Sequence, residues 1–221
     1  MTVDQLIKEI HTLYVQARYP IFRNKKLKHK RVFRGESRSI SSYVEDLFAK
    51  YLIEKLPPDT NLFINQIISS GSKSKRIRIK PDIMIVRDDE IKAIIDLKMD
   101  LGYNRKEFPK FWKKKDAQIS SIHGMTFSFY KKNEIEKTHS EISFSQKAKL
   151  FFIVISDGNM KEKYSTAIKK YKGKMKFSDI YFLLEGIHPN DPEITLKQLR
   201  RRNNASNVTL TKFNKALSAI I

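Results

Sequence analysis

The segment KPDIMIVRDDEIKAIIDLK, residues Lys80–Lys98, determines the fold class that we expect for this chain. Its apolar residues belong to two predicted strands, Ile77–Val86 and Ile91–Lys98, and the charged residues 87–90 between them predict a tight turn. A further predicted strand, Leu62–Ile68, precedes this pair. Three consecutive strands with short connections predict an antiparallel meander.

Helices are predicted before and after the meander, and two more strands follow it. The helical segments, recognised from apolar residues at a period of 3.6, are Leu6–Ala17, Val44–Leu56, Phe108 to about Tyr130, Lys161–Tyr171, Leu196–Arg202 and Thr211–Ile221. The later strands are Lys149–Ser156, with the core KLFFIVIS, and Ile180–Leu184. Unbroken apolar strands are typical of parallel sheets covered on both faces, so we expect these two to be parallel. The pattern predicts an α/β fold with a mixed central sheet of about five strands flanked by helices.

The chain is strongly basic: 44 lysines and arginines stand against 24 aspartates and glutamates, a formal charge of +20 at pH 7. Such a charge attracts polyanions, so we expect a nucleic acid as partner; a basic solubilising surface or a ribosome-associated protein is the alternative. The absence of cysteine excludes disulfides and thiolate zinc sites. The longest apolar run, Leu150–Ile155, is far shorter than the ~20 residues of a membrane helix, and no signal-peptide pattern begins the chain. We expect a cytoplasmic protein that does not contact a membrane.

Asp96 and Lys98 carry the first chemical signal. Because the side chains of a strand alternate between the two faces of a sheet, these two project from the same face. The opposite face carries Ile91, Ala93, Ile95 and Leu97. With Asp82 on the neighbouring strand, the two aspartates can bind a hard cation, which would polarise a phosphate and activate a water. Lys98 would orient that water or neutralise developing charge. The alternative is a surface turn with an ion pair between Asp96 and Lys98.

These residues, Pro81-Asp82 with Asp96-Leu97-Lys98, resemble the PD-(D/E)XK nuclease superfamily, which includes type II restriction endonucleases, junction resolvases and repair nucleases. The order of predicted elements also resembles that family, whose core runs helix, three-strand meander, helix, strand, helix, strand. The resemblance implies a DNA nuclease that uses Mg²⁺, replaceable by Mn²⁺, bound by Asp82, Asp96 and the backbone carbonyl of Leu97. It implies one nuclease domain over residues 1–221, with an N-terminal helix and basic arm (1–40), a restriction-endonuclease-like core (41–185) and a C-terminal helical addition (186–221).

Many members of the family also use a glutamate on the helix before the meander, and Glu45 occupies the matching position. At 100° per residue it lies at the edge of the apolar stripe, so we include it as a candidate catalytic residue and metal ligand. The alternative is a capping box, Ser42-x-x-Glu45, in which Glu45 only caps the helix start. Gln118 stands where some members carry a glutamine near the site, but Ile122 stands where the exonuclease-like branch has a tyrosine, which disfavours that branch.

Basic residues are dense on both sides of the proposed site. The candidates for contact with the DNA backbone are Lys73, Lys75, Arg76, Arg78 and Lys80 before Asp82, and Arg105, Lys106 and Lys113 after Lys98. Solvated surface charge is the alternative for each of them. The aromatic residues of FPKFWKKK, namely Phe108, Phe111 and Trp112, either wedge against DNA or form the packed face of an amphipathic helix.

The function that we expect is endonucleolytic cleavage of double-stranded DNA by a type II restriction endonuclease. Many such enzymes act as homodimers, so we expect a homodimer, and a cognate DNA methyltransferase acting on the same site is a candidate partner. Two alternatives stay open: a structure-selective nuclease such as a Holliday-junction resolvase or repair enzyme, and a non-catalytic basic protein that binds DNA or RNA.

Overall fold

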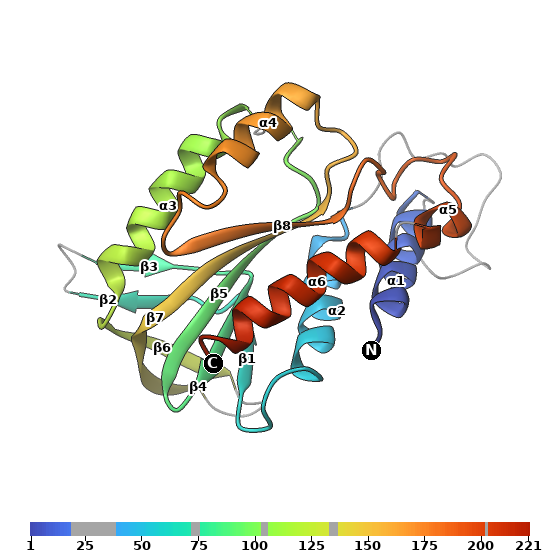
Figure 1. Ribbon diagram of the computed structural model, residues 1–221. Coiled ribbons are helices and arrows are strands. Elements are labelled where there is room, and N and C mark those ends of the chain that lie inside the picture. The colour runs from blue at the N-terminus through green and yellow to red at the C-terminus, as the bar shows by residue number, and fades with distance from the viewer. Residues whose placement is uncertain (19–38, 72–75, 103–105, 133–136, 202) are drawn as a thin grey trace.

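The computed structural model describes residues 1–18, 39–71, 76–102, 106–132, 137–201 and 203–221 (Figure 1). Its helices are α1 (Val3–Ala17), α2 (Ser41–Ile53), α3 (Phe108–Ile122), α4 (Glu162–Tyr171), α5 (Leu196–Arg201) and α6 (Asn203–Ser218). Its strands are β1 (Asn61–Ile64), β2 (Ile68–Ser70), β3 (Ile77–Ile79), β4 (Ile83–Arg87), β5 (Glu90–Lys98), β6 (Thr126–Lys132), β7 (Lys137–Ser156) and β8 (Ser178–Leu184). The predicted helices near both ends of the chain, and the helix between the last two strands, are therefore confirmed.

The strands form one mixed, open sheet with helices on both sides (Figure 1). Its main path has the order β1-β4-β5-β7-β6-β2-β3, and β8 pairs with β7 off this path. β1, β4 and β5 are antiparallel neighbours as expected, but they are not consecutive, because β2 and β3 lie between β1 and β4 in the chain. β7 runs parallel to β5, and β8 runs parallel to β7. The α/β class and the mixed sheet are confirmed, whereas the expected number of about five strands is wrong, because the described residues alone form a sheet of eight.

Two predicted strands divide, which accounts for part of this difference. The predicted strand Leu62–Ile68 breaks at Asn65, whose φ of 54° is incompatible with an extended chain. The predicted strand Ile77–Val86 breaks at Pro81, which has no N–H to donate to a ladder. The separated pieces β2 and β3 pair with each other, and β2 also pairs with β6.

The predicted helix from Phe108 to about Tyr130 is too long. Helix α3 ends at Ile122, and Gly124 follows with a φ of 73°, a left-handed conformation that ends a helix and that glycine adopts without strain. After it, β6 pairs antiparallel with the first part of β7, a strand of 20 residues, and the second part of β7 pairs with β5 and β8. In the C-terminal tail, the predicted helix Thr211–Ile221 begins earlier, at Asn203, and ends at Ser218.

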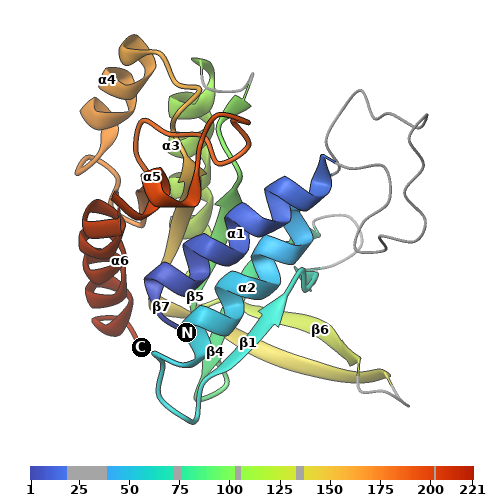
Figure 2. The same ribbon diagram turned by 90° about the vertical axis from the view of Figure 1, so that its right-hand side faces the viewer.

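The apolar core has two layers, one on each face of the sheet (Figures 1 and 2). On one face lie α1, α2 and α6, where the ring of Phe213 contacts the rings of Phe48 and Phe151. On the other face lie α3 and α4, where Trp112 is fully buried against Phe152. Most of β4 is buried because both of its faces are covered.

Strand β5 contributes residues to both layers. Ala93, Ile95 and Leu97 pack in the layer of α1 and α2, as strand alternation predicts. Ile91 packs in the layer of α3 instead, because the pairing register of β5 with β7 shifts between Ile91 and Ala93. The expectation that Ile91 shares a face with Leu97 is therefore wrong.

Candidate active site

Asp82 lies at the start of β4, beside the end of β5. The antiparallel ladder of the two strands ends at the pair Ile83 and Ile95, which puts Asp82 across from Asp96. Beyond the ladder, the Asp82 side chain takes the place of a backbone acceptor: its Oδ2 accepts the backbone N–H of Leu97 at 2.6 Å. Asp82 is thereby fixed beside the residues that the sequence predicted as its partners.

Asp96 and Lys98 project from β5 toward α3 and form an ion pair. The Asp96 side chain is 19% exposed and the Lys98 side chain 37%. The alternative to a metal site was a surface turn with an ion pair between Asp96 and Lys98. That ion pair is present, but it is half-buried. Among the residues that the structure describes, Oδ1 of Asp96 is buried and has no hydrogen-bond donor of normal geometry besides this ion-pair contact. The Asp96 carboxylate is therefore only partly compensated.

The charges at this centre oppose the ionisation of Asp82. Burial raises the pKa of Asp82 to about 6, and the neighbouring Asp96 carboxylate adds to the shift. The N–H of Leu97 and the Lys98 ammonium act in the opposite direction, and Glu45 adds a smaller repulsion. An oxygen-binding cation at this position would relieve the repulsion between the two aspartates.

Glu45 reaches the centre from α2, in the opposite helical layer. Its side chain is buried, and Oε2 accepts a hydrogen bond from the Asn65 side-chain amide. Asn65 also donates its backbone N–H to the carbonyl of Asp82 at 2.9 Å, which links α2 to the start of β4. Helix α2 begins after Ile40, without a side-chain cap, so Ser42 lies inside the helix. The capping-box interpretation of Glu45 is therefore wrong.

The oxygen atoms available here fit a hard cation such as Mg²⁺. Each residue in an antiparallel ladder directs its N–H and C=O toward the same neighbour, so the Leu97 carbonyl points to the side on which its N–H meets Asp82. Within the described ranges, no three His, Asp or Glu side chains are grouped closely enough to hold a metal by themselves. Two carboxylates and one carbonyl nevertheless match Mg²⁺, which uses one or two carboxylates and keeps several waters.

A small cavity of about 30 Å³ separates this centre from α3. Asp96 and Gln118 both line it, together with Pro81, Lys80 and Lys115. The Lys115 ammonium donates to the Gln118 side-chain oxygen at 3.3 Å. Gln118 thus lies near the centre on the buried side of its helix.

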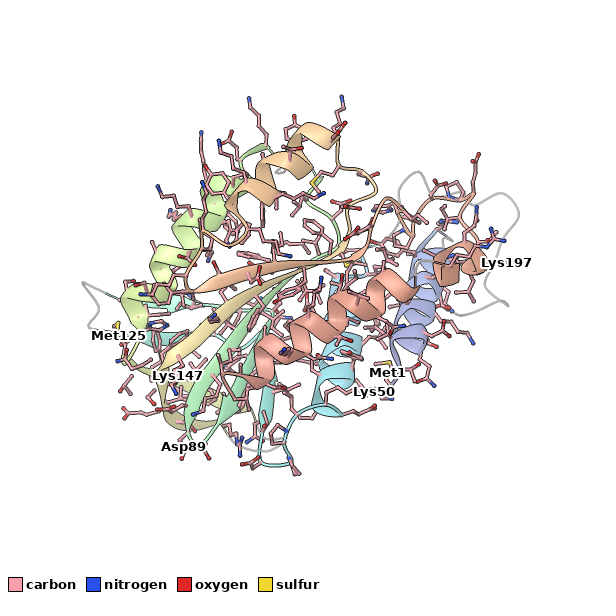
Figure 3. All side chains as sticks on the ribbon, in the orientation of Figure 1. Met1, Lys50, Asp89, Met125, Lys147 and Lys197 are labelled. Atoms are coloured by element: carbon pink, nitrogen blue, oxygen red, sulfur yellow. The ribbon has the colours of Figure 1, made fainter. Side chains whose placement is uncertain are left out.

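The proposed DNA-contacting residues differ in their placement. Lys73, Lys75 and Arg105 lie outside the described residues. Arg78, Lys80, Lys106 and Lys113 are exposed. Side chains with nitrogen ends project from the outer faces of α3 and α4 (Figure 3). The surface beside the centre therefore carries solvated positive charge on the side of α3.

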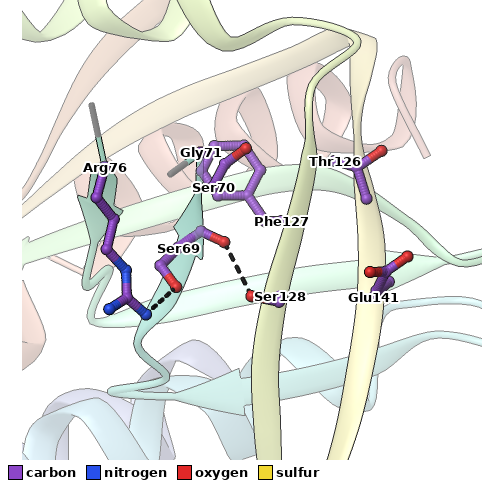
Figure 4. Close-up of a pocket in the computed structure, with 8 residues that line it drawn as sticks. All are labelled: Ser69, Ser70, Gly71, Arg76, Thr126, Phe127, Ser128 and Glu141. Atoms are coloured by element: carbon purple, nitrogen blue, oxygen red, sulfur yellow. Dashed lines mark hydrogen bonds between the residues drawn. The ribbon is translucent and has the colours of Figure 1, made fainter. Parts of the chain in front are cut away.

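Arg76 lines a separate pocket of about 310 Å³ between β2 and β6 (Figure 4). Its guanidinium donates to the Ser69 hydroxyl at 2.8 Å, and the Ser128 hydroxyl donates to the Ser69 carbonyl at 3.2 Å. Glu141 lines the same pocket. Among the described residues that line it, one arginine and one carboxylate make this pocket polar.

Two residues at this end of the sheet were not predicted. Asn65 belongs to this end of the sheet because it bonds to both Glu45 and Asp82, and the sequence gives no sign that β1 ends beside Asp82. Asp100 follows Lys98 at the strand period of two, so the sequence did contain a signal for it. It accepts hydrogen bonds from His188 Nε2 and Asn159 Nδ2, both at 3.2 Å, and the contact with His188 lowers its pKa.

Searches with this chain against protein-family models, curated proteins and solved structures find no match. In the part of the chain that the structure describes, no helix is both long and apolar enough to cross a bilayer.

Proposed function

We propose that this protein is a Mg²⁺-dependent endonuclease that hydrolyses DNA phosphodiester bonds at Asp82, Asp96 and Lys98. The charge of this centre supports the proposal best. The carboxylates of Asp96 and Glu45 both oppose the ionisation of half-buried Asp82, and the Lys98 ammonium offsets them only in part, in a chain whose formal charge is +20. Clustered carboxylates oppose folding unless a cation compensates them. An ion pair between Asp96 and Lys98 alone does not account for Asp82.

The arrangement of elements also supports it. If the additional strands β2, β3 and β6 are left aside, the chain order α2, β1, β4, β5, α3, β7, α4, β8 is the order of helix, meander, helix, strand, helix and strand that the PD-(D/E)XK resemblance implies. These five strands are also neighbours in that order within the sheet. The centre lies at the carboxyl end of β5, which pairs in parallel with β7, a common position for sites in α/β sheets.

Each residue of the centre has a separate role in this proposal. Asp82, Asp96 and the Leu97 carbonyl would hold the cation, and Mn²⁺ is expected to replace Mg²⁺. When bound, the cation polarises the scissile phosphate and lowers the pKa of a bound water. Lys98 is placed to orient that water and to neutralise the charge that grows on the phosphate. Glu45 supports the start of β4 through Asn65, with direct contact to the cation as the alternative.

Among DNA nucleases we favour a type II restriction endonuclease that acts as a homodimer on double-stranded DNA, with a methyltransferase that protects the same sequence. The exposed lysines beside the centre suit the duplex backbone. A structure-selective nuclease is the second candidate, because an aromatic-lined pocket opens next to Lys98. Such a pocket suits a base that is not stacked in a duplex.

Cleavage assays with matched variants test the proposal. Purified protein is incubated with plasmid, branched and single-stranded DNA in Mg²⁺, and in EDTA. We expect cutting only with the cation, and its loss in Asp82→Asn and Asp96→Asn. Asp89→Asn is the matched control, because Asp89 is an exposed acid on the same hairpin with a φ of 54°, which asparagine tolerates.

Discrete plasmid fragments would indicate a restriction enzyme, and cutting confined to branched DNA would indicate a structure-selective one. Wild-type rates in both site variants would contradict the assignment of the centre. If no DNA is cut in Mg²⁺ or Mn²⁺ while DNA is still bound, the protein is a non-catalytic binder and the proposal is wrong.

A further inference from the structure

A pocket of about 430 Å³ opens beside Lys98, between the end of β5 and the start of α3. Its lining residues are Lys98, Asp100, Leu101, Glu107, Phe108 and Phe111. Leu101 and Phe108 are buried, whereas Phe111 is 38% exposed. The Phe111 ring packs against Phe108 at 6.0 Å and Phe152 at 5.9 Å between ring centres, so it is held in place while part of it stays accessible.

We infer that this pocket holds an unstacked nucleobase of the substrate, next to the phosphate that is cut. The inference rests on the proposed function. Lys98 belongs to both the proposed centre and the pocket, so a nucleotide whose phosphate meets Lys98 has its base within reach of Phe111. Stacking on aromatic side chains is the usual way in which proteins hold bases that have left a duplex.

The polar groups in the pocket suit the edge of a base rather than a second phosphate. Asp100 and Glu107 are carboxylates, which accept hydrogen bonds from base amino groups and repel phosphate. Asp100 is oriented from outside the pocket, since His188 accepts the Asn190 N–H at Nδ1 and directs Nε2 to the Asp100 carboxylate. Glu107 is 59% exposed, with one ion pair to Lys110 at 3.2 Å. Adenine, cytosine and guanine carry amino groups that fit this lining, and thymine does not.

Positive charge lies on the rim of the pocket, where flanking phosphates would pass. Exposed lysines occupy the first turns of α3 and the residue before its cap, at Lys106, Lys110, Lys113 and Lys114. The Lys115 ammonium lies 5.7 Å from the centre of the Phe111 ring. An apolar floor, carboxylate acceptors and Lys98 in the lining, and further ammonium groups outside match a nucleotide whose base points inward and whose phosphate meets Lys98. The substrate is then DNA with a bulged, branched or single-stranded nucleotide, or a duplex from which the enzyme extrudes one.

Binding titrations in EDTA test the inference without requiring cleavage. Fluorescence anisotropy compares three labelled duplexes: one fully paired, one with a single-adenine bulge and one with an abasic bulge. Wild-type protein should bind the adenine bulge about tenfold more tightly than the abasic bulge. Phe111→Leu should lose most of this preference and Phe111→Trp should keep it. Tyr130→Leu is the control, since Tyr130 is an aromatic on β6 that is 58% exposed and does not line the pocket.

Equal wild-type affinity for the two bulges would overturn the inference. A Phe111→Leu variant that weakens binding to all three duplexes alike would also overturn it, because the residue would then be structural. The two proposals can fail separately. A protein that prefers the adenine bulge but never cuts DNA loses only the nuclease assignment, and one that cuts without the preference loses only the base pocket.

Discussion

Asp82→Asn distinguishes a cation-binding carboxylate from a structural one. Asparagine keeps the shape of the side chain and an oxygen that can accept the Leu97 N–H. It removes the negative charge that Asp96 and Glu45 repel. In the absence of divalent cations we therefore expect this substitution to increase the free energy of unfolding at neutral pH, although it removes a proposed catalytic group.

The raised pKa of Asp82 sets the magnitude. The change from 3.8 to about 6 is about two pH units, and each unit corresponds to ~1.4 kcal/mol. Because Asp82 is half-buried and solvent screens part of the repulsion, we expect ~1–2 kcal/mol rather than the full value. The folded protein binds this proton more tightly than the unfolded chain does. The destabilisation is therefore complete above about pH 6, decreases as the pH falls toward about 4, and is absent below that.

Urea unfolding in EDTA measures this difference for the wild type, Asp82→Asn and the control Asp89→Asn. We expect Asp82→Asn to be more stable than the wild type near neutral pH and nearly equal to it in the acidic range. With Mg²⁺ the order of the wild type and Asp82→Asn should reverse, because the wild type, unlike Asp82→Asn, gains binding energy from the cation. If Asp82→Asn is the less stable protein at neutral pH in EDTA, the carboxylate is stabilised by its surroundings and the reasoning is wrong.

Three further results are expected. Lys98→Ala should lower the single-turnover cleavage rate by ~10² or more with little change in DNA affinity. Lys98→Arg should not restore the rate, since a planar guanidinium cannot replace a compact ammonium. A near-normal rate for Lys98→Ala would exclude the catalytic role. Glu45→Gln should raise the Mg²⁺ concentration for half-maximal cleavage by ~10-fold, as measured by metal titration, and an unchanged midpoint would limit Glu45 to packing. The logarithm of the DNA-binding constant should fall with the logarithm of the salt concentration, with a slope of about −0.9 per phosphate contact. The double variant Lys106→Glu, Lys113→Glu should flatten this slope on every DNA sequence. An unaltered slope would place DNA on another face of the protein.

The centre could be predicted from the sequence because its geometry is local. Asp96 and Lys98 share a face through the period of two in a single strand, and Asp82 comes next to them through one tight hairpin. No long-range information is needed for either relation. The bulge that moves Ile91 to the other face depends instead on how β5 pairs with β7, so alternation alone could not show it.

The rest of the sheet depends on contacts between distant segments. The second half of β7 is an unbroken apolar run and was recognised. Its first half is mostly polar, with Ile142 and Phe144 as its buried apolar residues, and it has strand structure because it pairs with β6. The position of Glu45 also depends on distant contacts. Its hydrogen-bond partner Asn65 reaches it because the end of β1 lies beside Asp82 in the folded protein. His188 and Asp100, far apart in the chain, likewise meet only in the folded protein. Local patterns predict elements, whereas pairing determines which side chains meet at the end of an element.

The acidic centre and its basic surroundings act in opposite directions on DNA, and Lys98 lies where they meet. A phosphate that approaches Asp82 and Asp96 is repelled while no cation is present, although the lysines of α3 attract the same strand. A divalent cation at the carboxylates reverses the local repulsion without altering the lysines. Under the proposed function, cation and DNA therefore raise each other's affinity by the same factor, as thermodynamic linkage requires. Under the same proposal, the cation would compensate the repulsion from Asp96, which adds to burial in raising the pKa of Asp82, and cleavage would depend on that cation.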